Sequence, residues 1–537
     1  MSNLKTITEV FGNVVDVINR EIYPGKLTLK DGKIANIERV DETFSTYLIP
    51  GFIDAHVHIE SSMLVPTEFA RIAVTHGTVG TISDPHEIAN VIGMDGINLM
   101  IDNGLKSPFY FYFGAPSCVP ATAFETAGAE ITAADIDHLL SRDDVVYLSE
   151  MMNFPGVIYK DPTVMEKLEV ARKHDKPIDG HSPGLMGPDM PKYFDSGITT
   201  DHECYMIEEA RDKLNHGVKI MIREGSAAKN FDELIPLIED FPEQIMFCCD
   251  DKHPDSLMES HIDDHVRRAV GLGYDLFDVL RAASHNVVKH YNLPTGLLQE
   301  GDAADFLEVK DLEDFDILKT IIGGQVVAEN GQSYLEKVET AELNQFNTHP
   351  KTKEDFSLNI STDKVRVIEA LDRQLITNEI HVTPGADDLL KIAVVNRYAD
   401  TDVSTALIRN FGLKSGAIAG SVAHDCHNIV VVGATDEDIT RAVNLIIENK
   451  GGISLVNGEE EHILPLPIAG IMTNQSAEEA AEAYIRMDRR AKELGSQLSA
   501  PFMTLSFMAL LVIPELKLSD LGLFNGKEFK FVDVGVA

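Results

Sequence analysis

Apolar runs alternate with amphipathic segments through the middle of the chain. Eight apolar runs are predicted to be buried strands, at residues 45–58, 77–84, 108–115, 144–150, 176–181, 197–203, 217–224 and 244–251. Helical periodicity separates them, and the first predicted helix, 66–77, begins at Pro66 and ends at Gly77. Continuously apolar strands that alternate with helices indicate a parallel sheet covered on its outer face. Eight such units within residues 50–297 predict an α/β fold, a (β/α)8 barrel.

The segments on both sides of this region are rich in short strands. Asp31-Gly32 lies between two alternating apolar runs, which predicts a hairpin, and a similar pattern returns at 296–331. We therefore predict one small β domain built from residues 1–49 and 298–335. Residues 336–357 are polar and predict a linker, and residues 355–537 predict a separate C-terminal α/β domain. The apolar stretch 503–513 is too short to span a bilayer and predicts a buried segment.

Composition and charge exclude several classes of partner. Hydrophobic residues make up 44% of the 537 residues, which suits a large core. Lys and Arg number 46 against 86 Asp and Glu, and the net charge of −40 argues against binding to nucleic acid or to an anionic membrane. The N-terminus lacks the features of a signal peptide, so we expect a cytoplasmic protein, which could form a homo-oligomer. The cysteines form no CxxC pair and are expected to be reduced and mostly buried: Cys118, Cys204, Cys248, Cys249 and Cys426.

Two histidines, His56 and His58, end the first predicted barrel strand. Residues i and i+2 of a strand point to the same face, so both imidazoles can bind one metal centre. An HxH pair alone is a weak signal, because many such pairs are ordinary core or surface residues. The signal strengthens because more ligand-type side chains occur where later strands end, on the face that carries the active site in barrel enzymes. These are Glu150, His181, His202 and Asp250.

The predicted ligand set contains only nitrogen and oxygen donors. Such a set suits Mn, Fe or Zn and does not choose between them. Four histidines and two carboxylates are enough for two divalent metals, with Glu150 placed to bridge them. We expect Asp250 to act as a ligand or proton shuttle. Its neighbour Asp251 is expected to point the other way, because side chains alternate along a strand.

Other residues near the predicted strand ends are weaker candidates for substrate contacts: Glu60, Ser61, His86, Glu87, Ser117 and Arg223. For His86 and Glu87 an equally good interpretation is a solvated pair that follows a capping turn. A histidine-rich group also occurs in the C-terminal region: His424, Asp425 and His427. This group could reach the barrel mouth as a lid, but we favour a local hydrogen-bond cluster.

With these residues identified, the chain resembles the amidohydrolase superfamily, whose metal-dependent barrel is joined to a small β domain formed by both flanks. Within it the chain resembles the adenine deaminases. Many relatives carry a carboxylated lysine at the end of the fourth strand. This chain has Glu150 there, and adenine deaminases also have a glutamate at this position. The resemblance therefore favours a deaminase over the dihydroorotase and hydantoinase branches. The matching segments span nearly the whole chain: 56–63, 84–93, 117–122, 180–184, 201–203, 223–230, 249–254, 421–433, 464–472 and 501–518.

The resemblance implies hydrolysis of adenine, a small purine base, to hypoxanthine and ammonia in purine salvage, with Mn or Fe in the site. A hydroxide would attack C6, and Asp250 would accept its proton and deliver it to the departing amine. A nearby acid would protonate a ring nitrogen; Glu150 is one candidate, although a bridging carboxylate has few lone pairs to spare. Two alternatives stay open: deamination of another base or cyclic-amide hydrolysis, and a catalytically inactive scaffold of the same fold.

Overall fold

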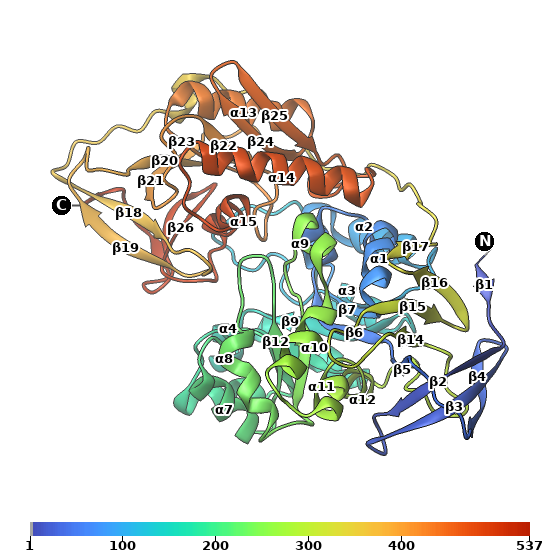
Figure 1. Ribbon diagram of the computed structural model, residues 1–537. Coiled ribbons are helices and arrows are strands. Elements are labelled where there is room, and N and C mark those ends of the chain that lie inside the picture. The colour runs from blue at the N-terminus through green and yellow to red at the C-terminus, as the bar shows by residue number, and fades with distance from the viewer. Residues whose placement is uncertain (1–3, 537) are drawn as a thin grey trace.

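In the computed structural model, which describes residues 4–536, strands from both flanks form one sheet. The strand order is β1-β16-β15-β14-β5-β2-β3-β4, and β17 pairs with β16. The predicted hairpin joins β3 to β4, and Asp31 and Gly32 have the positive φ angles of 52° and 76° that its tight turn requires. Figure 1 shows this sheet beside the barrel. Its strands are β1 (Lys5–Thr6), β2 (Glu9–Asp16), β3 (Glu21–Lys30), β4 (Lys33–Arg39), β5 (Tyr47–Pro50), β14 (Phe306–Val309), β15 (Ile317–Ile322), β16 (Gln325–Glu329) and β17 (Gln332–Ser333).

Eight parallel strands form an α/β domain of the TIM-barrel type. Five of them pair in the order β10-β9-β8-β7-β6, and three in the order β11-β12-β13. Backbone hydrogen bonds join the two sheets at both seams, from Thr199 N to Ile178 O and from Asp250 N to His56 O. The strands are β6 (Phe52–Val57), β7 (Thr78–Ser83), β8 (Tyr110–Ala115), β9 (Val145–Met151), β10 (Ile178–Gly180), β11 (Thr200–Asp201), β12 (Lys219–Arg223) and β13 (Ile245–Cys248).

Each predicted strand run overlaps one of these eight strands, with one correction. The run 45–58 is two strands, because β5 pairs with β14 in the flanking sheet whereas β6 enters the barrel. The predicted helix 66–77 begins at Pro66, continues as a 3-10 turn after Ala73 and ends at Gly77, whose φ is 75°. The helices that follow the strands are α1 (Pro66–Ala73), α2 (His86–Gly104), α3 (Ala133–Leu140), α4 (Phe154–Ile158), α5 (Pro162–Lys173), α6 (Met190–Phe194), α7 (Ile207–Asn215), α8 (Phe231–Leu234), α9 (Pro254–Glu259), α10 (Ile262–Gly271), α11 (Leu276–Ala282) and α12 (His285–Tyr291).

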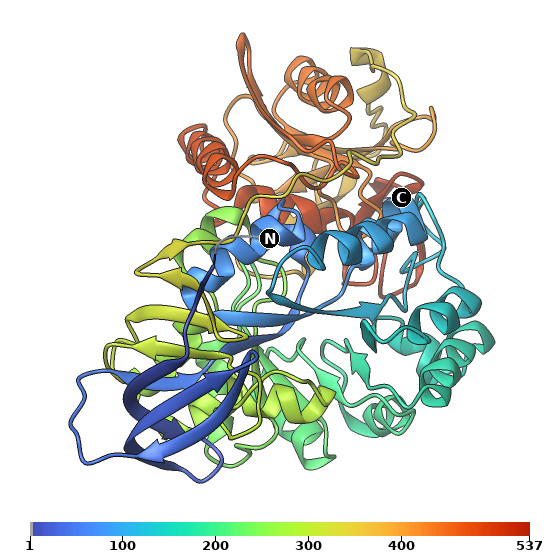
Figure 2. The same ribbon diagram turned by 90° about the vertical axis from the view of Figure 1, so that its right-hand side faces the viewer.

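The C-terminal part of the chain lies across one end of the barrel (Figures 1 and 2). Its larger sheet has the order β19-β18-β21-β20-β23-β22-β24-β25, with β29 against β18, and β26-β27-β28 form a smaller sheet. The elements are β18 (Lys364–Ala370), β19 (Thr377–Val382), β20 (Leu390–Val395), β21 (Ser404–Arg409), β22 (Ala417–Gly420), β23 (Ile429–Gly433), β24 (Gly452–Asn457), β25 (Glu460–Pro465), β26 (Leu516–Ser519), β27 (Gly522–Asn525), β28 (Lys530–Phe531), β29 (Gly535–Val536), α13 (Asp436–Glu448), α14 (Ala477–Glu493) and α15 (Pro501–Ser506).

Two predictions about buried segments are confirmed. The apolar stretch 503–513 is almost wholly buried, with Met503 and Met508 at 0% exposure. All five cysteines are buried and form no disulfide. Within the described residues, no helix combines the length and apolarity needed to cross a membrane.

Candidate active site

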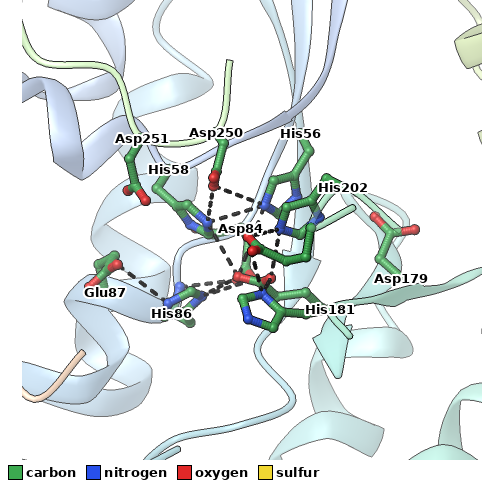
Figure 3. Close-up of polar contacts among 12 residues, drawn as sticks. His56, His58, Asp84, His86, Glu87, Asp179, His181, His202, Asp250 and Asp251 are labelled. Atoms are coloured by element: carbon green, nitrogen blue, oxygen red, sulfur yellow. Dashed lines mark hydrogen bonds and ion pairs between the residues drawn. The ribbon is translucent and has the colours of Figure 1, made fainter. Parts of the chain in front are cut away.

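The six predicted metal ligands converge at the carboxyl ends of the barrel strands. Figure 3 labels five of them: His56, His58, His181, His202 and Asp250. The Nε2 atoms of His56 and His58 lie 3.1 Å apart. Asp250 Oδ1 lies 3.6 Å from His56 Nε2 and 3.2 Å from His58 Nε2. All six side chains are buried, so the cluster is shielded from bulk water: His56, His58, Glu150, His181, His202 and Asp250.

Glu150, on β9, lies between two halves of this cluster. Its Oε1 atom is 3.3 Å from His58 Nε2. Its Oε2 atom is 2.6 Å from His181 Nδ1 and 3.2 Å from His202 Nε2. The two oxygens of one carboxylate therefore face two different groups of histidines, which is the arrangement expected of a ligand shared by two metal ions.

The hydrogen bonding of His58 indicates that its inward nitrogen is free for a metal. Its Nδ1 atom lies 3.2 Å from the backbone oxygen of Asp84. Since a carbonyl only accepts, Nδ1–H must be the donor, and in the neutral ring Nε2 then carries a lone pair. Such a backbone contact is typical of metal-binding histidines, whose second nitrogen is fixed in this way. Ligand atoms of His56, His58 and Asp250 all lie within 4.8 Å of one another, and those of His56, Glu150 and His202 do the same.

The charge state of the two carboxylates also suits divalent cations. Burial alone would favour the neutral acids, but Arg223 and the neighbouring histidines hold the pKa of Asp250 well below its usual range. Against the same effect of burial, His181 and His202 hold the pKa of Glu150 well below its usual range. Both side chains are therefore carboxylates at neutral pH.

The backbone at Asp250 corrects the predicted orientation of Asp251. Asp250 has a φ of 57°, which interrupts the strand alternation on which that prediction relied. A cavity lies between the ends of the barrel strands and the C-terminal part of the chain, and both Asp250 and Asp251 line it. Asp251 also accepts a hydrogen bond from Ser61 Oγ. Burial and the adjacent Asp250 raise the pKa of Asp251 to about 6.

Two of the weaker candidates, His86 and Glu87, line the cavity. His86 Nδ1 is 2.9 Å from Asp84 Oδ2 and 3.6 Å from Glu150 Oε1. His86 is 3% and Glu87 1% exposed, so the alternative of a solvated pair is wrong.

Two other weaker candidates, Ser61 and Glu60, hold neighbouring groups. The Ser61 hydroxyl donates a hydrogen bond to Asp251. Glu60 accepts a hydrogen bond from the backbone N–H of Ile88, and burial together with Glu87 raises its pKa to about 7.

Ser117 and Arg223 hold other site residues in place. Ser117 Oγ donates to the backbone oxygen of Glu150 over 2.6 Å. Arg223 Nη1 donates to Asp250 Oδ2 over 2.6 Å and also pairs with Glu203. Glu203 lines the cavity, with Oε1 3.5 Å from His202 Nε2. Sequence reasoning passed over Glu203, although it directly follows His202.

The C-terminal domain forms the roof of the cavity, contrary to the favoured prediction of a separate cluster. His424 Nδ1 and His427 Nε2 both contact the carboxylate of Glu87 on α2. The rings of His424 and Phe507 stack with centroids 4.5 Å apart. The roof residues that line the cavity are Leu375, His424, Asp425, Phe507 and Leu510. The prediction failed because His424 and His427 lie more than 330 positions from Glu87, and no sequence periodicity reports such a contact.

A buried ion cluster that the sequence did not predict supports two of the ligands. Lys213 Nζ is 3.0 Å from Asp201 and 2.7 Å from Glu209, and all three side chains are 0% exposed. Lys213 also donates to the backbone oxygen of Ser182. Asp201 precedes His202 and Ser182 follows His181, so this cluster fixes the ends of two ligand-bearing strands.

Comparison with known proteins agrees with this geometry. Residues 47–327 match the amidohydrolase family, and residues 366–530 match the adenine deaminase C-terminal domain. The adenine deaminase of Sulfurovum sp. (strain NBC37-1) is 55% identical over 98% of this chain and 99% of its own. The adenine deaminase of Salinibacter ruber is 53% identical over 98% of both chains. That of Methanosarcina mazei is 49% identical over 97% of this chain and 98% of its own. The chain therefore belongs to the amidohydrolase family and, within it, to the adenine deaminases.

Proposed function

We propose that this protein hydrolyses adenine to hypoxanthine and ammonia at a centre of two divalent metal ions. The observation that carries the proposal is the position of Glu150, whose two oxygens face separate groups of histidines at the strand ends. The similarity to adenine deaminases over nearly the full chain identifies the substrate class.

Side chains of the barrel would hold the two ions. His56, His58 and Asp250 would bind one, His181 and His202 the other, and Glu150 both. Nitrogen and carboxylate oxygen donors suit Mn or Fe, and also Zn. When bound, such ions supply Lewis acidity and lower the pKa of water so that it can act as a nucleophile near neutral pH.

Asp250 would transfer the proton during hydrolysis. Arg223 and the histidines keep it a carboxylate, so it can accept a proton from the attacking water. Its Oδ2 atom is held by Arg223, whereas Oδ1 faces His56 and His58. The new bond joins the water oxygen to C6. The proton then passes from Asp250 to the exocyclic nitrogen, which leaves as ammonia when the C6–N bond breaks.

The rest of the chain would serve this reaction. The proposed division is a small β domain (1–49 and 298–335), a catalytic barrel (50–297) and a C-terminal domain (355–537). The substrate would be a free purine base, so we propose a role in purine salvage. The acidic composition supports a cytoplasmic location and a small-molecule substrate in place of nucleic acid.

The test is an absorbance assay on protein purified from medium supplemented with manganese. Conversion of adenine to hypoxanthine, lost in a chelated sample and restored by Mn²⁺, supports the proposal. A protein that binds two metal ions but leaves adenine unchanged would overturn the substrate assignment. A panel of other purines, pyrimidines and cyclic amides would then identify the true substrate within the family.

A further inference from the structure

Apart from atoms of the six predicted metal ligands, three buried polar atoms of the cavity wall have no hydrogen-bond partner among the described residues. They are Nε2 of His424, Oδ2 of Asp425 and Nε2 of His86. His424 and Asp425 are each 2% exposed. The great majority of buried polar side chains in proteins are hydrogen-bonded, so unpaired ones that line a cavity are positioned to bind a polar ligand. Two of the three come from the C-terminal domain.

Two contacts fix the orientation of His424. Glu87 binds its Nδ1 atom, and the Phe507 ring stacks on its face at an interplanar angle of 11°. The nearest carboxylate to Nε2 is Asp251, at 3.9 Å, which is too far for a hydrogen bond. Since Nδ1 binds the Glu87 carboxylate, Nε2 is the ring nitrogen left for a ligand. Although burial opposes the charge, Glu87 and Asp251 raise the pKa of His424 to about 9, which favours the imidazolium form in which Nε2 also donates.

The surrounding roof is built to keep that orientation. His427 accepts a hydrogen bond at Nδ1 from the backbone of Ala423, so its Nε2–H donates to Glu87. Lys517 Nζ donates to the backbone oxygens of Leu375, over 2.7 Å, and Phe507, over 2.9 Å. Lys517 thereby joins two segments that line the cavity. Fixed polar groups of this kind give specificity, because they lose little freedom when the ligand binds.

We propose that the C-terminal domain supplies the contacts that read the purine ring: His424 Nε2–H donates to a ring nitrogen, and Asp425 accepts from the N–H of the imidazole ring. This inference rests on the proposed function, since it takes adenine as the substrate. His424 and Asp425 are then specificity-determining residues, whereas the barrel residues carry the chemistry.

The chemistry of the free base fits these two contacts. Unsubstituted adenine has ring nitrogens that accept and one imidazole N–H that donates. A nucleoside has no such N–H, because its sugar replaces that hydrogen at N9. A carboxylate left without its partner in a buried site is strongly unfavourable, so Asp425 selects the free base over the nucleoside.

The test combines residue variants with altered substrates. The variants are His424→Gln and Asp425→Asn, with His427→Gln as the matched control, because His427 also binds Glu87 but does not line the cavity. Each metal-loaded protein is assayed with adenine. Inhibition constants are measured for 1-, 3- and 7-deazaadenine, for 7- and 9-methyladenine and for hypoxanthine. Metal content and melting temperature are recorded for every variant.

We expect His424→Gln and Asp425→Asn to lower kcat/KM for adenine about 10- to 100-fold and to keep their metal. The penalty of His424→Gln should vanish for one deaza analogue, and that of Asp425→Asn for one methylated analogue. For His427→Gln, any loss should be the same for every analogue. Wild-type protein should bind the same two analogues at least tenfold more weakly than adenine, a result that needs no variant.

Equal penalties for adenine and all analogues would overturn the inference, because the residues would then act only through the fold. Wild-type binding that ignores every analogue change would also overturn it, even if the variants fail to fold. In both cases wild-type turnover of adenine would leave the proposed function intact. Wild-type protein that binds metal but does not convert adenine would overturn the proposed function together with this inference.

Discussion

The barrel rim, which carries the six predicted ligands at the strand ends, and the C-terminal roof form the two sides of one cavity. The two sides are constructed differently. The rim presents ligand atoms that face one another, such as the Nε2 atoms of His56 and His58, 3.1 Å apart. The roof presents polar atoms that have no hydrogen-bond partner within residues 4–536, such as His424 Nε2. Mutually facing donor atoms suit a cation, whereas isolated ones suit an organic ligand with several polar atoms. The difference separates the chemistry of the reaction from recognition of its substrate.

The largest effect is expected from Glu150→Gln at the rim. A neutral amide cannot bridge two cations as a carboxylate does, so the variant should lose metal and at least about 1,000-fold in kcat. Metal content by mass spectrometry and the adenine assay are the two measurements. Full metal occupancy with full activity would show that Glu150 is not a shared ligand.

Asp250→Asn separates proton transfer from metal binding at the same rim. The amide keeps the shape of the side chain and an oxygen that can still bind one cation, which is enough for a ligand that serves a single ion. It cannot accept a proton, so kcat should fall about 1,000-fold while the metal content stays close to wild type. The exposed Asp240→Asn is the matched control and should behave as wild type. Unchanged turnover in Asp250→Asn would show that Asp250 does not transfer the proton.

Lys213→Met tests how the rim is supported. Removing the ammonium leaves Asp201 and Glu209 as unpaired buried carboxylates, which should cost about 3–5 kcal/mol of folding free energy. Denaturant unfolding measures this loss. The exposed Lys192→Met should change stability by less than about 0.5 kcal/mol. Equal stabilities for the two variants would remove the case for a buried ion cluster.

Acid lability should arise within the barrel, away from the roof. Burial lowers the pKa of His265 to about 4, against about 6.5 in the unfolded chain. Between these values only the unfolded chain binds the proton, so stability is full above pH 6.5 and falls by about 3 kcal/mol as the pH drops to 4. His265→Leu should weaken this dependence, whereas the exposed His138→Leu should not. Identical pH–stability curves would contradict the assignment.

The smallest effect is expected from Glu87→Gln at the roof contact. The amide keeps the bulk but loses the charge that holds His424 and His427. KM for adenine should rise about tenfold while the metal content stays unchanged, which distinguishes this variant from the chemically identical change at Glu150. Loss of metal in Glu87→Gln would erase the distinction between rim and roof.

The same two regions show how far sequence reasoning extends. The strand ends could be predicted because apolar runs mark the barrel strands, and a polar residue directly after a run falls on one known face. This rule is enough to predict that His181 and His202 lie at the rim. Asp251 was misplaced because a positive φ at Asp250 breaks the alternation, and no residue type signals that φ. The roof was missed because the contact between His424 and Glu87 depends on how two domains pack.

Titration of metal-free protein with Mn²⁺, with adenine turnover followed at each step, tests the two-metal centre most directly. Activity should rise until two equivalents are bound and then stay constant, because Glu150 would bind both ions. Full activity at one equivalent, or activity without metal, would contradict a two-metal centre at the barrel rim.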